Sequence, residues 1–204
     1  MLESKQLAAQ RGAATLFSGI DFRLAPGDAL LVTGANGSGK TTLLRIAAGL
    51  SHAAQGTLSW RGVAVAPLDA ELRAAVTYIG HAAALKDELT AEENLASQTS
   101  LHAGSADSGA IARALGLWSL DRQRALPARA LSMGQRRRIG LARLALVPRP
   151  LWILDEPAAA LDAAGLALLC GMIGAHLAQG GMAIIATHQD IGLSGPSVRG
   201  LALS

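Results

Sequence analysis

The sequence is poor in aromatic residues and has a single cysteine. Aromatics make up 3% of the 204 residues while half of all residues are apolar. The core must therefore be built mainly from Ala, Leu, Ile and Val, a composition that suits helices packed on a sheet. Because Cys170 is the only cysteine, the chain cannot form an internal disulfide. Its place in an apolar run favours a small buried side chain over a nucleophile or redox group.

A long hydrophobic run is also missing. The most apolar stretch, residues 166–178, is shorter than the roughly 18 residues that a membrane-spanning helix needs, and it carries His176. The first residues include Glu3 and lack the apolar centre of a signal peptide. We therefore expect a chain that remains in the cytoplasm and has no membrane span of its own.

Charge of one sign is only slightly in excess, with a formal net charge of +3. Its main concentration is the run Arg136, Arg137 and Arg138. Because no aromatic residue interrupts this run, it favours a solvent-facing helix surface over a nucleic-acid site. We expect no direct nucleic-acid partner.

Strand and helix signals alternate along the chain, which indicates an α/β fold with a mainly parallel sheet. Residues 29–32 form a short apolar run before a glycine-rich loop, and residues 40–48 have helical character. The other predicted elements of this core are strands at 151–154 and 182–187, a helix at 162–179, and extended segments at 56–62 and 74–79, which we assign to an antiparallel edge region.

Residues 85–147 have helical character with polar faces, and we interpret them as a helical lobe inserted in this core. Thr90 and Glu93 have the spacing of a capping box, in which each side chain accepts a hydrogen bond from the other residue's backbone N–H. Ser132 similarly predicts the start of a helix, which the prolines at 148 and 150 end. The length favours one domain over residues 1–204.

A phosphate-binding loop is the first motif that carries chemistry. Its glycines let successive backbone N–H groups turn toward one point, and the helix that follows adds its positive end. Lys40 is expected to reach the β- and γ-phosphates of ATP, and the Thr41 hydroxyl to bind Mg²⁺. An incidental glycine-rich turn is disfavoured because the motif lies between a strand and a helix. The full match to G-x-x-x-x-G-K-[S/T] is Gly34, Ala35, Asn36, Gly37, Ser38, Gly39, Lys40 and Thr41, and we extend the predicted binding segment to Thr42.

Two adjacent acids follow the apolar strand predicted at 151–154. Asp155 and Glu156 are placed at the strand's carboxyl end, the edge at which open α/β sheets bind ligands. Because successive strand residues point to opposite faces, the two acids can have different tasks. We expect Asp155 to hold Mg²⁺ through water opposite Thr41, and Glu156 to polarise the water that attacks the γ-phosphate.

Further motifs resemble those of ATP-binding cassette (ABC) proteins. Residues 131–135, Leu-Ser-Met-Gly-Gln, resemble the LSGGQ signature, with Met133 in place of its first glycine. Residues 160–162, Ala-Leu-Asp, resemble the loop after the acidic strand, and His188 within residues 186–190 resembles the switch histidine. The order and spacing agree from about residue 1 to 190. The resemblance implies a P-loop NTPase fold with a helical signature subdomain.

In that family, the signature of one subunit completes the nucleotide site of another. The resemblance implies a head-to-tail dimer of two copies, in which Ser132, Gly134 and Gln135 contact the γ-phosphate bound by the partner chain. It implies that His188 bridges the γ-phosphate and the water at Glu156, and that Asp162 crosses the interface.

Two further positions depart from the usual family pattern. Where an aromatic residue commonly stacks on adenine, this chain offers Arg11, whose planar guanidinium can also stack on a base. A solvent-facing arginine is the alternative. Where a glutamine is usual, the chain has His81, which can offer a ring nitrogen to metal-bound water.

Residues 80–81 and 85–95 give a closer resemblance, to the ATP-binding subunit of the haem exporter of cytochrome c maturation. It implies a peripheral ATPase on the cytoplasmic face of the bacterial inner membrane that docks on integral membrane subunits, which handle the haem. Two alternatives remain open: an ATPase subunit for another small substrate, and a cassette ATPase outside transport. A nucleotide-binding module without turnover is disfavoured by the presence of Lys40, Asp155, Glu156 and His188.

Overall fold

The structure, a computed structural model, describes residues 1–103, 107–189, 191–195 and 197–203, with the backbone alone for 101–103. The chain forms two compact units. The first consists of Met1–Tyr78, Arg149–Glu156 and Cys170–Ser204, and the second of Ile79–Pro148 and Pro157–Leu169. The single domain expected over residues 1–204 stays a prediction.

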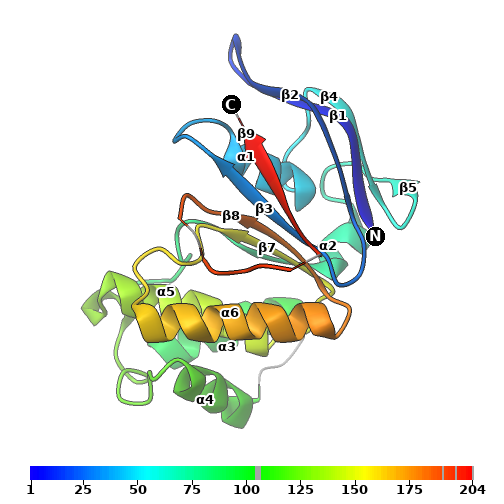
Figure 1. Cartoon of the computed structure of the whole chain (residues 1–204). Helices are drawn as coiled ribbons and strands as arrows, with labels where there is room; N and C mark the ends of the chain where they lie inside the picture. The colour runs from blue at the N-terminus through cyan, green and yellow to red at the C-terminus, as the bar shows by residue number, and fades with distance from the viewer. Residues whose placement is uncertain (104–106, 190, 196, 204) are drawn as a thin grey trace. The chain divides into compact units, whose positions relative to one another are not determined.

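A five-stranded sheet carries the predicted parallel core. In sheet order its strands are β6 (Val76–Ile79), β7 (Leu151–Asp155), β8 (Met182–Ala186), β3 (Ala29–Gly34) and β9 (Val198–Leu203). The pairs β7 with β8, β8 with β3 and β3 with β9 are parallel. Strands β7 and β8 are buried along their whole length, as expected of parallel strands covered on both faces. Figure 1 shows β3 between β8 and the last strand, β9.

A second sheet of four antiparallel strands belongs to the first unit. Its order is β2 (Ala14–Leu24), β1 (Leu2–Arg11), β4 (Gln55–Trp60) and β5 (Val63–Ala64). The antiparallel region predicted at residues 56–62 is thus confirmed. The assignment of residues 74–79 to it is wrong, because Ala74 and Ala75 end a helix and β6 pairs beside β7 in the five-stranded sheet.

The core of the first unit is aliphatic, as the composition predicts. Leucine, isoleucine, valine and alanine side chains from both sheets and from α1 (Lys40–Ala47) fill it, with Trp60 and Phe17 as its buried aromatic residues. A short helix, α2 (Ala70–Ala75), precedes β6 and is capped by Asp69, which accepts a hydrogen bond from the Leu72 amide. Cys170 is half-buried, and its thiol donates to the carbonyl of Ile191.

The second unit is mainly helical. Its elements are α3 (Ala91–Ala103), α4 (Ser108–Leu117), the 3₁₀ turn η1 (Ala128–Ala130), α5 (Met133–Ala142) and the 3₁₀ turn η2 (Arg143–Ala145). Helix α6 (Ala163–Ala178) contributes its first residues to this unit and the rest to the first.

The capping box predicted at Thr90 and the helix start predicted at Ser132 are confirmed. The Thr90 amide donates to the Glu93 carboxylate and the Glu93 amide to the Thr90 hydroxyl, at 2.8 and 3.1 Å. Ser132 and Gln135 make the equivalent pair at the start of α5. These bonds satisfy amides that a helix leaves without an internal partner, so they fix where α3 and α5 begin.

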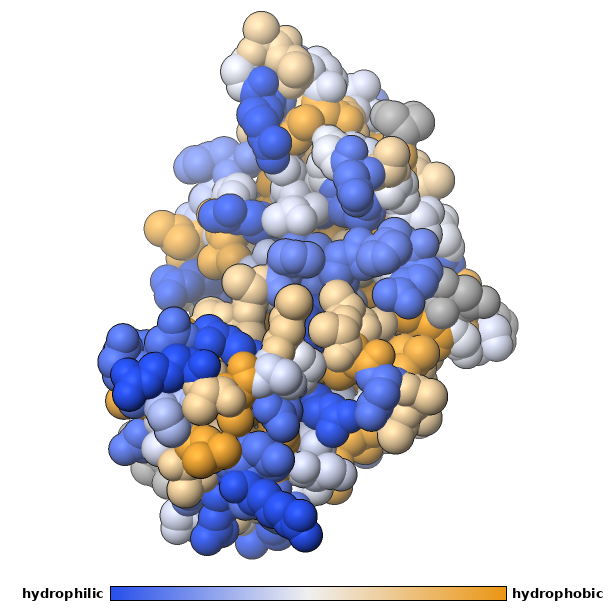
Figure 2. Space-filling view, turned by 90° about the vertical axis from the view of Figure 1, so that its left-hand side faces the viewer, coloured by the Kyte–Doolittle hydropathy of each residue, from blue (hydrophilic) through white to orange (hydrophobic). Residues whose placement is uncertain are grey.

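No helix in the described part of the chain combines the length and the apolar character that crossing a membrane requires. The face of the molecule in Figure 2 mixes hydrophilic and hydrophobic residues.

Candidate nucleotide site

The loop between β3 and α1 has the backbone of an anion-binding turn. Gly34, Gly37 and Gly39 have φ angles of +147°, +88° and +97°, which residues with a Cβ rarely adopt. Gly39 is the N-cap of α1 and offers no side chain to the first amides, and the first helical turn has no acidic residue. The positive end of α1 therefore remains available to a negatively charged group.

Close contacts also require glycine in this loop. A Cβ on Gly34 would lie 2.5 Å from the carbonyl oxygen of Leu203 on β9, and one on Gly39 would lie 2.9 Å from the Phe17 ring. Sequence reasoning missed both partners. Phe17 and Leu203 are apolar residues of strands that the sequence pattern did not predict. They come close to the loop only in the folded chain.

Two polar side chains in the loop are well placed for phosphate. Lys40 is 8% exposed, and its ammonium donates to the carbonyls of Gly34 and Ala35 at 2.7 and 3.2 Å. The Ser38 hydroxyl is buried and has no hydrogen-bond partner among the described residues. Because a buried hydroxyl without a partner costs free energy, a ligand oxygen there would satisfy it. Ala35, Asn36 and the other predicted residues of this loop lie in the same segment, and Thr42 lies in the first turn of α1.

Thr41 and Asp155, the two residues predicted to hold Mg²⁺, meet across 114 residues of sequence, and their role toward the metal stays a prediction. The Thr41 hydroxyl donates to a carboxylate oxygen of Asp155 at 2.8 Å, and Asp155 is 1% exposed at the end of β7. These hard oxygen donors fit Mg²⁺, which binds through one or two protein oxygens and keeps water and phosphate as its other ligands. Among the described residues there is no cluster of three or more His, Cys, Asp or Glu side chains that could hold a metal.

The charge of Asp155 acts on Tyr78, to which sequence reasoning assigned no role. Burial, and then the charge of Asp155, raise the pKa of the Tyr78 phenol, while Arg45 acts in the opposite direction. The phenol therefore stays protonated and keeps its O–H available as a donor.

Glu156 and His188, which were predicted to act on the same water, form a second pair. The His188 ring nitrogen Nδ1 lies 2.8 Å from a Glu156 carboxylate oxygen, with side chains 59% and 12% exposed respectively. Glu156 has a φ of +50°, a conformation that is unusual for a residue with a side chain and that is found often at functional sites. Its amide donates to Ala186 at the end of β8, which fixes the turn. Asp190, within the predicted switch motif, lies outside the described residues.

The remaining predicted residues are dispersed. Ser132, Gly134 and Gln135 are together at the start of α5 in the second unit. There the Gln135 amide donates to the Ser132 hydroxyl at 3.2 Å, so this hydroxyl keeps its proton for an outside acceptor. His81 is an exposed residue of the same unit. Arg11 is exposed at the end of β1, where it pairs with Ala14 across the hairpin, and its contact with adenine stays a prediction.

One expectation about the arginines is wrong. The run 136–138 does not lie on a solvated surface: Arg137 is 4% exposed and hydrogen-bonded to backbone carbonyls, and Arg138 pairs with Asp162 at 2.7 Å. Arg137 is thus buried while Arg136 and Arg138 are half-buried, and their partners are distant in sequence, so that no local pattern predicts them.

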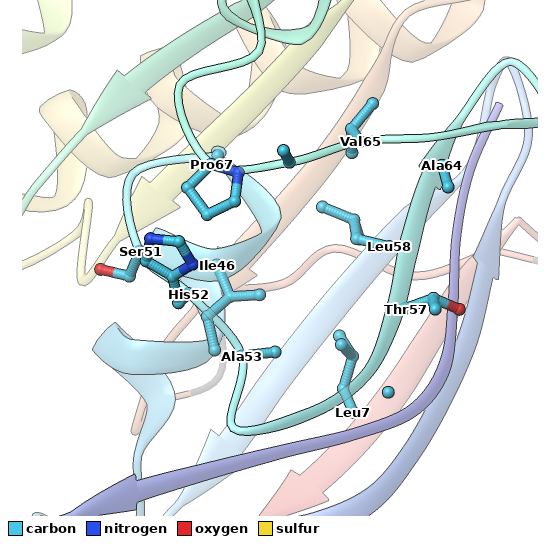
Figure 3. Close-up of a pocket in the computed structure, with 13 residues that line it drawn as sticks. Leu7, Ile46, Ser51, His52, Ala53, Thr57, Leu58, Ala64, Val65 and Pro67 are labelled. Carbon is cyan, nitrogen blue, oxygen red and sulfur yellow. The ribbon is translucent and has the colours of Figure 1, made fainter.

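A cavity of about 190 Å³ elsewhere in the first unit is not the nucleotide site. Figure 3 shows it between the loop after α1 and strand β4, with His52, Pro67 and Leu58 on its walls. It lies at the end of α1 opposite to the phosphate loop, near Ile46 and Gly49. A helix C-terminus carries partial negative charge, so this end of α1 disfavours phosphate.

Comparison with known proteins agrees with this geometry. The ABC transporter family matches residues 17–159. Among solved structures, an ATP-binding subunit of an ABC transporter superposes with a TM-score of 0.80 at 26% identity, covering 92% of this chain and 79% of its own. A dimeric ATP-binding cassette in a post-hydrolysis state, bound to ADP and Pi, has the same fold with a TM-score of 0.79 at 23% identity, covering 93% of this chain and 88% of its own.

Curated relatives give a narrower group. The chain is 45% identical over its full length to the cytochrome c biogenesis ATP-binding export protein CcmA of Nitrosomonas europaea, of which it covers 96%. The protein of the same name from Methylococcus capsulatus is 46% identical over 95% of this chain and 93% of its own. The chain therefore belongs to the ABC transporter family, as an ATP-binding cassette ATPase of the cytochrome c biogenesis export type.

Proposed function

We propose that this chain is the ATP-hydrolysing subunit of a membrane exporter that serves cytochrome c biogenesis, with haem as the substrate handled by partner subunits. The observation that carries the ATPase part is the presence of two predicted pairs beside one phosphate loop: Thr41 with Asp155 and Glu156 with His188, each at 2.8 Å. The relatives named above support the export part.

In the proposed site, the loop amides and Lys40 bind the phosphates. The Lys40 ammonium now donates to two loop carbonyls, and it exchanges them for β- and γ-phosphate oxygens when ATP binds. Ser38 donates its otherwise unpartnered hydroxyl. The loop backbone already directs its N–H groups toward one point. The loop therefore needs little reorganisation when ATP binds.

Mg²⁺ would be held by the Thr41 hydroxyl and, through water, by Asp155, with His81 as a further candidate through water. When bound, the ion would supply positive charge that balances the charge developing on the phosphates. In the protein without nucleotide, the hydrogen bond from Thr41 to Asp155 holds both side chains together where the ion would bind.

Glu156 is proposed to polarise the attacking water, with His188 holding the carboxylate and reaching the γ-phosphate. The Glu156 carboxylate is largely shielded from solvent, which suits a general base held in place by the protein. The His188 side chain is exposed, which suits a residue that contacts the ligand. Arg11 is the proposed adenine contact.

A second copy of the chain completes each site in this proposal. Its Ser132 hydroxyl and the first-turn amides at Gly134 and Gln135 approach the γ-phosphate in a head-to-tail dimer, and Asp162 faces the same interface. Release of the γ-phosphate removes the group that joins the copies, so the dimer reopens. Integral membrane subunits, reached from the cytoplasmic face of the bacterial inner membrane, convert this motion into export.

The test is carried out in cells that make c-type cytochromes and lack the chromosomal copy of this chain. Wild-type protein is expected to restore covalent attachment of haem to cytochrome c on denaturing gels, while Glu156→Gln is not. Purification in mild detergent identifies the co-purifying membrane proteins and any haem. Restored cytochromes with the Glu156→Gln protein, shown separately to have lost hydrolysis, would contradict the coupling of ATP to this process.

A further inference from the structure

Arg137, the buried arginine of α5, makes hydrogen bonds that have no part in the site proposed above. The Arg137 side chain lies among backbone oxygens of two segments that are far away in sequence. Its Nη1 donates to the carbonyl of Gly80 at 2.7 Å and to that of His81 at 3.2 Å, while Nε donates to the carbonyl of Pro157 at 3.3 Å. All of these residues belong to the second unit.

These three bonds connect segments that matter for hydrolysis. Gly80 and His81 form the turn in which a metal-water contact is proposed, and Pro157 directly follows Glu156 in the chain. Helix α5 itself begins at the signature residue Ser132. One guanidinium therefore links the signature helix to both segments.

Further contacts on α5 fit the helix to the same two segments. A Cβ on Gly134 would lie 2.7 Å from the carbonyl of Ala160, so the first turn approaches the backbone after Pro157 closely. Arg138 pairs with Asp162 at 2.7 Å. On the next turns, Gly140 lies against Ala83, just after His81.

The chemistry of the arginine suits this task. Burying a guanidinium is unfavourable unless its donors find acceptors, and here the carbonyl oxygens of three residues accept from Nε and Nη1. Its fixed fork of N–H groups sets directions as well as distances, which the single ammonium of lysine does not. Removal of the side chain would take these three hydrogen bonds away, so the two segments would lose contacts that fix them relative to α5.

We propose that Arg137 is a positioning residue for ATP hydrolysis, which holds the turn at Gly80 and His81 and the segment that begins at Pro157 in register with the signature helix. It touches no nucleotide and acts through these backbones. This inference rests on the proposed ATPase function. Loss of the side chain should lower kcat, because misplacement of a reacting group by about 1 Å costs up to about a hundredfold in rate. It should leave ATP binding to the phosphate loop unchanged.

The experiment compares the full-length wild type with Arg137→Gln and Arg137→Lys. Hydrolysis gives kcat and KM, a fluorescent ATP analogue gives Kd, and amide hydrogen exchange reports on the two segments without turnover. We expect Arg137→Gln to lower kcat about tenfold to a hundredfold at unchanged Kd, and to speed exchange at residues 80–83 and 157–161 together. Arg137→Lys should recover part of both.

Leu141→Ala is the matched control, because Leu141 is fully buried on the same helix. It should lower the melting temperature while kcat and exchange in the two segments change little. Equal loss of kcat in Leu141→Ala and Arg137→Gln at equal loss of melting temperature would overturn the proposal, as would unchanged exchange in either segment of Arg137→Gln. If Arg137→Gln does not fold, Arg137→Lys is judged by the same criteria. If the wild type shows no hydrolysis that depends on Lys40, the proposed function fails, whereas the exchange result still tests Arg137.

Discussion

Single side chains at the carboxyl ends of β7 and β8 combine a shielded acid with an exposed histidine. Glu156 is held at a φ of +50° while its backbone amide is bound to Ala186, so its carboxylate has a fixed direction. His188 lies within hydrogen-bond distance of that carboxylate. Such a pair separates the task of polarising water from the task of binding phosphate, so a variant can remove the first and keep the second.

Glu156→Gln is therefore expected to keep ATP binding and to lose hydrolysis by at least about a hundredfold, the usual contribution of a general base. The neutral amide has nearly the same shape and still accepts a hydrogen bond from His188, but it does not take a proton from water. Steady-state phosphate release and size-exclusion chromatography with ATP check this, the latter for an accumulated dimer. Hydrolysis at the wild-type rate would show that another group activates the water.

His176 is a second residue with a testable charge. Its ring stacks on Trp152 with centroids 3.9 Å apart, and burial lowers its pKa from the ordinary 6.5, against the opposing effect of the carbonyls of Met182 and Pro150. A histidine whose pKa is lowered on folding stabilises the protein fully above the unfolded value, and this contribution is lost as pH falls through the folded one. The folded state is thus weakened by acid at this residue.

We expect the free energy of unfolding of the wild type to decrease as pH falls below 6.5, and to decrease less in His176→Phe. Phenylalanine keeps a flat ring on Trp152 and cannot bind a proton. Urea unfolding followed by tryptophan fluorescence on both sides of that pH measures the difference. Identical pH dependence in the two proteins would remove His176 as its source.

At the level of helices and strands, the sequence predicted those features that depend on residues close together in the chain. The capping boxes at Thr90 and Ser132, the glycine loop and the strand before Asp155 are all short patterns with a local physical cause. Strands β1, β2 and β9 were not predicted, because β1 pairs with register shifts, β2 is largely exposed and β9 has exposed residues within it. Partner strands from elsewhere in the chain stabilise them, and strand propensity depends strongly on such context.

The candidate site divides in the same way. Pairs such as Thr41 with Asp155 were predictable because each member belongs to a recognisable motif. Phe17 was not predictable in this way, since it lies against Gly39, a residue far from it in sequence. The contacts of Arg137 span up to 57 residues and likewise became visible only in the fold.

The cap of α3 can be tested directly. Thr90→Ala removes the hydroxyl that accepts from the Glu93 amide, and we expect it to lower the free energy of unfolding by about 1 kcal/mol, the typical effect of losing such a cap. Thr90→Ser keeps the hydroxyl and should remain close to wild type. Chemical unfolding followed by circular dichroism gives both values, and an equal loss in the two variants would show that the methyl group matters rather than the cap.

For the whole molecule, the residues predicted to bind one nucleotide occur in both compact units and in two copies of the chain. Lys40 belongs to the first unit and Ser132 to the second. The dimer proposed above has each loop facing a signature from the other copy, so neither copy alone has a complete site.

Mixing two inactive variants should therefore restore activity. In a dimer of Ser132→Arg with Lys40→Ala, one site has an intact Lys40 opposite an intact Ser132, and the other site has neither. With random pairing half of the dimers are mixed and each has one of two sites, so we expect about one quarter of the wild-type sites. Phosphate release is measured for each variant alone and for the mixture. No gain on mixing, with mixed dimers shown to form, would contradict the composite site.

The contact between Gly34 and Leu203 has a practical meaning for anyone who handles this protein. Strand β9 pairs with β3 and lies against the start of the nucleotide loop, with the Leu203 carbonyl where any side chain at position 34 would have to go. A change that shortens or displaces β9 should therefore be read as an alteration of the ATP site.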